Sequence, residues 1–140
     1  ASFTIVGSAA SAPLFADTPR LDSLIVLDRE GRLVGALGSP GGNAILAYNA
    51  KALVGLLAWD LPLVEAFSLP NLVARGDSFN GEASRFTSAV RDGMERRGVT
   101  VVPGSGEASG LHGVVAGPDG LTGAADPRRE GVAIVLETVQ

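Results

Sequence analysis

Cysteine is absent from this sequence, and histidine occurs once, as His112. Without cysteine there is no disulfide and no thiolate metal site, and one histidine does not make a zinc cluster by itself. We therefore expect no metal and no other cofactor. Aromatic residues are few, at 5% of the chain, and core packing accounts for them.

Clustered positive charge and long apolar runs are also missing. The net charge is −4, and basic residues never occur more than two in a row. Binding to nucleic acid or to an anionic membrane surface requires clustered positive charge, so neither partner is expected. The longest apolar run, Ala52 to Trp59, is far shorter than the roughly 20 residues of a membrane span. We expect it to form a core helix.

What is present is the composition of a globular protein, with 46% apolar and 19% charged residues. A chain of 140 residues fits one domain, and a domain of this size buries roughly 70% of the surface of its unfolded chain. We therefore expect a single domain, residues 1–140, with a substantial core.

Short β-rich runs separated by turn residues predict hairpins near both ends of the chain. One hairpin is expected from Ser23–Leu27 and Leu33–Leu37, joined by a polar turn that ends in Gly31. Another is expected from Leu111–Ala116 and Leu121–Ala124. One strand is predicted within the first twenty residues, whose short apolar pieces are Phe3–Val6 and Leu14–Phe15. Further single strands are predicted at Leu72–Arg75, Val99–Val102 and Val132–Val139.

Helical patterns lie between the hairpins. A mostly buried helix is expected over Asn43–Trp59, followed by a short helix that Asp60 caps and that runs to Phe67. An amphipathic helix is expected over Glu82–Arg97, ending before Gly98. Hairpins with helices grouped between them predict an α+β layered domain rather than a parallel doubly wound one.

The segment Gly38–Asn43, with the sequence GSPGGN, lies between a predicted strand and a predicted helix. Its paired glycines, Gly41 and Gly42, allow a ligand to approach the backbone closely. The first N–H groups of a helix have no partner within the helix, so such a junction can bind a phosphate, a carboxylate or a developing oxyanion. The segment matches neither a dinucleotide-binding motif nor a P-loop, which leaves a nucleotide poorly supported.

Further glycine-containing strings follow in the C-terminal third: GLHG at Gly110–Gly113, GPDG at Gly117–Gly120 and GAADPRREG at Gly123–Gly131. In their order and spacing after GSPGG, these strings resemble the C-terminal part of the small subunit of gamma-glutamyltranspeptidases. The resemblance extends from about Ser23 to the C-terminus. It implies an N-terminal-nucleophile fold, a layered α-β-β-α sandwich of which this chain forms the C-terminal portion.

The resemblance also implies a function. Enzymes of that family transfer or hydrolyse the gamma-glutamyl group of glutathione-like donors through an N-terminal threonine, and a pair of glycine N–H groups stabilises the oxyanion. That role falls on Gly41 and Gly42 here. The implied partners are a small gamma-glutamyl substrate, the large subunit and the nucleophile segment, and the implied location is periplasmic or secreted.

Two features depart from the family. The chain starts at Ala1, without the family's terminal threonine, so we expect the nucleophile to be absent and the isolated chain to be inactive. Where the family has serines for the substrate carboxylate, this chain has residues 19–24, PRLDSL. We assign Arg20, Ser23 and Ser39 as candidate substrate-binding residues.

Arg20 is suited to pair with a carboxylate, whereas Asp22 would repel it, which leaves another amide substrate open. A noncatalytic module that binds an anion at the Gly41 and Gly42 amides is the alternative. Two other features have structural interpretations. We expect His112 to make a structural hydrogen bond, and residues 126–130 to form a turn held by pairing of aspartate with arginine.

Overall fold

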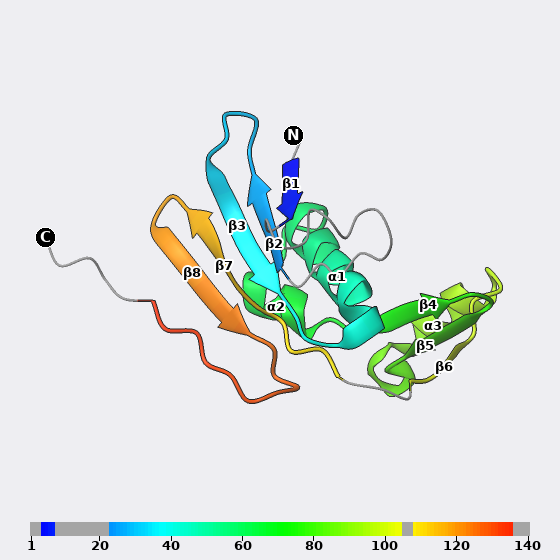
Figure 1. Cartoon of the computed structure of the whole chain (residues 1–140). Coiled ribbons are helices and arrows are strands. Elements are labelled where there is room, and N and C mark those ends of the chain that lie inside the picture. Colours follow the sequence, from blue (N-terminus) through cyan, green and yellow to red (C-terminus); the bar gives the residue numbers. More distant parts are fainter. Residues whose placement is uncertain (1–3, 8–22, 105–107, 136–140) are drawn as a thin grey trace, which may run out of the picture.

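The computed structural model describes residues 4–7, 23–104 and 108–135, and it has the expected α+β character. Its larger sheet has five strands in the order β1-β2-β3-β7-β8, all antiparallel (Figure 1). The bounds of these strands are β1 Thr4–Gly7, β2 Ser23–Leu27, β3 Leu33–Gly38, β7 His112–Gly117 and β8 Gly120–Ala125. Pairing of β3 with β7 places the N-terminal hairpin beside the C-terminal one.

Both predicted hairpins are confirmed. They could be predicted because their turns depend on residues within the turn itself. In the β2–β3 turn, Asp28 Oδ1 accepts the backbone N–H groups of Glu30 and Arg32 at 3.0 and 2.9 Å. Gly31 supplies the positive φ of 79° that the turn needs. At the other end of the sheet, Gly120 does the same with a φ of 112°.

Two helices pack on one face of the larger sheet (Figure 1): α1 Ile45–Leu57 and α2 Leu63–Ser68. Gly55 allows their close approach, since a Cβ there would lie 3.0 Å from the Cβ of Ala66. The core lies between the helices and the sheet. Its largest fully buried apolar side chains are Phe67 and Leu111, each contributing roughly 1.5–3 kcal/mol through burial.

The prediction that Asp60 caps the second helix is wrong. Asp60 has a φ of 53°, and the Leu61 N–H donates to the Gly55 carbonyl, so Asp60 belongs to the turn that follows α1 and its C-cap Ala58. Pro62 occupies the N-cap position of α2. The chain must turn sharply between two packed helices, and the left-handed residue at position 60 makes that turn.

A smaller sheet lies to the side of the larger one, covered by a third helix (Figure 1). It contains β4 Leu72–Arg75 and β5 Ser78–Gly81, which are antiparallel, and β6 Val101–Pro103, which is parallel to β5. The crossover helix α3 spans Ser88–Glu95 and is shorter than predicted, because Thr87 caps it by accepting the Val90 N–H. Strand β5 was not predicted.

The predicted last strand, Val132–Val139, is not found where the structure describes it. Residues 131–135 have no regular structure, and residues 136–139 lie outside the described part. Residues 131–135 run alongside β8 (Figure 1), so closely that a Cβ at Gly123 would lie 3.0 Å from the Cβ of Ala133. Val132 is 79% exposed, so this stretch adds no backbone ladder and little core. None of the described helices has the length and apolar character to cross a bilayer.

Candidate functional site

The glycine loop, which we define as Ser39–Gly42, connects β3 to the 3-10 turn Gly42–Ala44 that leads into α1. Gly41 and Gly42 have φ values of 141° and 56°, which side chains of L-residues rarely allow. A Cβ at Gly41 would also lie 2.6 Å from the ring of Tyr48. Among the hydrogen bonds of the described residues, none is donated by the Gly41 or Gly42 N–H. Both amides are therefore available to a ligand.

Ser39 anchors this loop. Its side chain is buried, and its hydroxyl accepts the Gly110 N–H at 3.0 Å while donating to the Pro40 carbonyl at 2.8 Å. Gly110 lies so close behind the loop that a Cβ there would be 2.9 Å from the Pro40 ring. The hydroxyl of Ser39 is thus used within the fold, and the backbone of residues 108–111 supports the loop.

Asp126 in turn holds the segment that supports the loop. This carboxylate is 2% exposed and accepts the Ser109 hydroxyl and, at 3.3 Å, the Leu111 N–H. The Asp126 N–H also donates to the Leu111 carbonyl at 2.6 Å. Burial acts to raise the pKa of Asp126, but hydrogen bonds from Ser109 and Arg128 outweigh it and lower the pKa.

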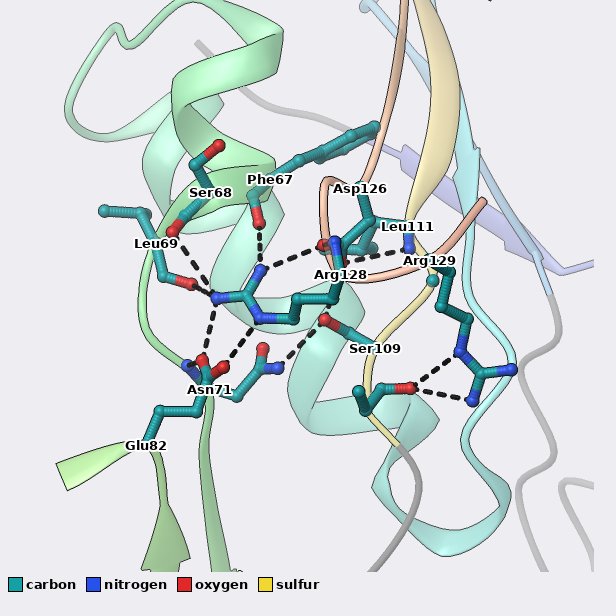
Figure 2. Close-up of polar contacts among 12 residues, drawn as sticks. Phe67, Ser68, Leu69, Asn71, Glu82, Ser109, Leu111, Asp126, Arg128 and Arg129 are labelled. Atoms are coloured by element: carbon teal, nitrogen blue, oxygen red, sulfur yellow. Dashed lines mark hydrogen bonds and ion pairs between the residues drawn. The ribbon is translucent and has the colours of Figure 1, made fainter. Parts of the chain in front are cut away.

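Arg128 lies at the centre of this polar cluster (Figure 2), and its side chain is only 7% exposed. Its guanidinium binds Glu82 through two contacts of 2.7 and 2.8 Å, and Asp126 at 3.0 Å. It also donates to the carbonyls of Phe67 and Leu69, at the end of α2. The expected aspartate–arginine turn is confirmed, and the same arginine joins the end of α2, the residue after β5 and the C-terminal turn.

The charges in this cluster neutralise one another. Burial acts to raise the pKa of Glu82, but the hydrogen bonds from Arg128 and from the Asn71 N–H lower it to about 2. Glu82 accepts from Arg128, Arg85 and the Asn71 N–H, so both carboxylate oxygens are occupied. A partly buried ion pair with all its hydrogen bonds made has a structural role, because it has little capacity left for a ligand.

Lys51 extends the cluster into α1. Its ammonium donates to the carbonyls of Phe67 and Leu69 and to Asn71 Oδ1, at 2.8 to 3.1 Å. Asn71 then donates to the Ser109 hydroxyl at 2.9 Å. Burial, and secondarily the charge of Arg128, lower the pKa of Lys51 to about 8. Helix α1, whose first turn follows the glycine loop, is thereby tied to the same scaffold.

A pocket of about 210 Å³ opens beside the glycine loop, between α1 and the smaller sheet. Gly41 and Tyr48 form one side of it, and Arg75, Asn80 and Glu82 from β4, β5 and the residue after β5 form the other. Within the described residues, no group of histidine, aspartate and glutamate side chains is placed to hold a metal.

The structure brings part of the predicted site together. Gly41, Gly42 and Ser39 share one loop, and Ser23 is paired with Gly38, directly before that loop. Arg20 lies outside the described residues. The predicted hydrogen bond of His112 is found, with its Nδ1 3.1 Å from the Gly110 carbonyl oxygen.

Several residues of the site were not predicted: Asn71, Arg75, Asn80, Glu82 and Ser109. They come from segments far apart in the sequence, and no motif contains them together. The only local indication was the density of charged residues between positions 126 and 130, which suggested pairing but no distant partner.

Comparisons with known proteins agree with this architecture. Residues 21–136 match the gamma-glutamyltranspeptidase family model. The Acylase ACY 1 proenzyme of Pseudomonas sp. strain SE83 is 33% identical over 109 residues, which cover 77% of this chain and 19% of that protein. The chain therefore spans about a fifth of the length of this relative.

Solved structures show the same fold. The gamma-glutamyltranspeptidase of Pseudomonas nitroreducens, complexed with L-DON, superposes with a TM-score of 0.69 at 25% identity, covering 94% of this chain and 71% of that chain. The transpeptidase CapD of Bacillus anthracis gives a TM-score of 0.62 at 22% identity, covering 79% and 68%. The α+β arrangement described above is thus part of an N-terminal-nucleophile-type layered sandwich.

Proposed function

The chain belongs to the gamma-glutamyltranspeptidase family, and we propose that it is the C-terminal part of the small subunit of an enzyme that cleaves gamma-glutamyl amides. In this proposal the N-terminal threonine nucleophile and the large subunit are supplied by other parts of the protein. The chain contributes the glycine loop as the oxyanion site. Glutathione-like compounds are the proposed donors, and water or an amine is the acceptor.

The observation that carries this proposal is the state of the Gly41 and Gly42 amides. Both have positive φ, and neither donates a hydrogen bond within the described residues. When a nucleophile attacks an amide carbonyl, the oxygen becomes negatively charged, and N–H groups already in position stabilise it without reorganisation. Ser39 and the supporting segment 108–111 keep the loop in place before the substrate arrives.

The proposal is tested by alanine substitutions in the loop of the complete, processed protein. Gly42→Ala adds a Cβ that meets nothing within 4 Å, so its effect comes from the disfavoured φ of 56°. Gly41→Ala adds a clash with Tyr48 as well. We expect the kcat for a gamma-glutamyl anilide to fall by roughly 10²-fold or more in Gly41→Ala, and by less in Gly42→Ala.

Gly98→Ala is the matched control. Gly98 also has a positive φ, of 76°, and open space around its Cβ position, but it lies after α3 and outside the loop. If backbone strain alone lowered the kcat, Gly98→Ala and Gly42→Ala would lower it equally. Equal kcat values in these two variants would therefore contradict the oxyanion role of the loop.

The isolated 140 residues are expected to show no hydrolysis of the same anilide, because the nucleophile is proposed to lie in another segment. Turnover by the purified chain alone would contradict this. If anion binding at the loop occurred in a complete protein that never turns over the anilide, the noncatalytic module would be the better description.

The remaining assignments extend the proposal. Arg20 and Ser23 are proposed to contact the substrate, while Ser39, whose hydroxyl is bonded within the fold, acts by holding the loop. A periplasmic or secreted location is proposed from the family.

A further inference from the structure

The pocket beside the glycine loop has polar groups that the fold does not use. Within the part of the chain that the structure describes, neither the Arg75 guanidinium nor the Asn80 side-chain amide makes a hydrogen bond or an ion pair. Arg75 ends β4 and Asn80 lies in β5, and both line the pocket. A cation and an amide donor without protein partners therefore face the same space.

The other charge on the pocket wall is already neutralised. Glu82 is bound by Arg128 at 2.7 and 2.8 Å and by Arg85 at 3.4 Å. Its carboxylate therefore has little capacity to attract a cation from solution. Among the described residues that line the pocket, Arg75 carries the one charge without a partner, and it is positive. An anion is the complementary ligand.

Apart from Asn71, whose side chain is bonded to Lys51 and Ser109, the rest of the described wall is apolar or backbone. The Val73 side chain and the Tyr48 ring give the pocket apolar surfaces. Gly81 and Gly104 have no side chains, so they leave space beside the backbone. Burial and then the charge of Glu82 raise the pKa of Tyr48, whereas the charge of Arg75 acts in the opposite direction. The Tyr48 ring lies where a Cβ at Gly41 would be, so this side of the pocket adjoins the glycine loop.

We propose that this pocket binds a substrate carboxylate through Arg75 and Asn80, while the attached aliphatic chain lies against Val73 and Tyr48 and leads to the glycine loop. This inference deepens the proposed function and rests on it. A planar carboxylate matches the two parallel donors of a guanidinium. A small volume of about 210 Å³ suits a short aliphatic acid.

A phosphate fits this wall less well than a carboxylate. Arg75 is the one unpaired cation among the described lining residues, so it can neutralise a carboxylate but not both negative charges of a phosphate. A monoanion needs only the charge of Arg75. The carboxylate can belong to the acyl donor or to the acceptor amine, and kinetics separate these two sources.

Equilibrium binding tests the site without turnover. Glutarate is titrated calorimetrically into the complete processed protein, beside glutaramide, in which uncharged amides replace the carboxylates. We expect Arg75→Gln to weaken glutarate binding by roughly tenfold or more and to leave glutaramide unchanged. Arg96→Gln, an exposed arginine at the end of α3 and away from the pocket, should bind glutarate like the wild type.

Kinetics of the same variants identify the source of the carboxylate. If the donor supplies it, Arg75→Gln raises the KM of a glutaryl anilide and not that of a butyryl anilide. If the acceptor supplies it, the KM rises for glycylglycine and not for glycinamide. The proposal is overturned if wild-type protein does not bind glutarate at millimolar concentration, or if Arg75→Gln binds it as tightly as the wild type.

This outcome is separable from failure of the proposed function. Gly42→Ala is expected to lower kcat while glutarate binding stays the same, because Gly42 does not line the pocket. Arg75→Gln is expected to weaken glutarate binding, a readout that requires no turnover. Loss of only one of these two effects shows which of the two proposals is wrong.

Discussion

Arg128 and Arg75 carry the same guanidinium group, but the fold uses them differently. Arg128 is 7% exposed and binds two carboxylates and the carbonyls at the end of α2. Arg75 is exposed at the end of β4 and, among the described residues, makes no hydrogen bond or ion pair. The charge of Arg128 therefore stabilises the fold, whereas the charge of Arg75 is available to a ligand.

The difference follows from where each arginine lies. Buried carbonyls at the end of a helix need donors, and a buried carboxylate needs a cation, so Arg128 is surrounded by groups that depend on it. Arg75 is next to a two-residue turn in a small sheet with few buried neighbours. Substitutions at the two positions should therefore have opposite consequences for stability and for binding.

The largest expected effect is that of Arg128→Ala. Removing this guanidinium leaves Asp126 buried without its cation and leaves the carbonyls of Phe67 and Leu69 without one of their donors. We expect the free energy of unfolding to fall by about 3–5 kcal/mol, measured by urea denaturation. Arg96→Ala, at an exposed position, is the control, and a comparable loss in both variants would show that Arg128 has no special structural role.

An intermediate effect is expected on acidification. The pKa of Glu82 in the folded chain is about 2, below its ordinary value of 4.5, so Glu82 contributes stability above pH 4.5 that is lost as the pH falls toward 2. The pKa of Asp126 is lowered as well and acts in the same direction. Urea denaturation at a series of pH values should show stability falling through this range.

Glu82→Gln should reduce that dependence on pH, because the glutamine does not titrate. The loss should be on the order of 1–3 kcal/mol smaller than in the wild type between pH 5 and pH 2. Glu95→Gln, at an exposed position in α3, is the matched control and should keep the wild-type dependence. Equal pH dependence in the two variants would mean that the Glu82–Arg128 pair does not carry the effect.

The smallest expected effect is the stability change of Arg75→Gln. Since Arg75 has no protein partner among the described residues, its replacement should change the free energy of unfolding by less than about 0.5 kcal/mol. Thermal and urea denaturation measure this directly. A loss of 2 kcal/mol or more would place Arg75 with Arg128 as a structural residue and would remove the distinction between them.

Much of the fold follows from local sequence. The β2–β3 hairpin was predictable because Asp28 and Gly31 determine its turn, and α1 was predictable from its apolar spacing. The positions of Gly41 and Gly42 in a loop before a helix were also predictable, because they lie between a β-rich run and the apolar pattern of α1. The function of their free amides remains a proposal that depends on the rest of the protein.

Predictions failed where a distant contact decides. Asp60 has the side chain of a helix cap, but the packing of α1 on α2 requires a left-handed residue there. Strand β5 has a weak strand sequence and forms because β4 and β6 pair with its two edges. The helix predicted from Glu82 starts later, since Glu82 is engaged by Arg128 and Thr87 provides the cap.

The hairpin turns, the position of α1, the glycine loop and the family follow from the amino-acid sequence, because each depends on residues close together in the chain or on strings in a recognisable order. Which charges are used within the fold depends instead on contacts between distant segments. Glu82 meets Arg128 across 46 positions, and Ser39 meets Gly110 across 71. Such pairs form when packing brings distant segments together, and among the described residues that packing leaves Arg75 at the pocket without a partner.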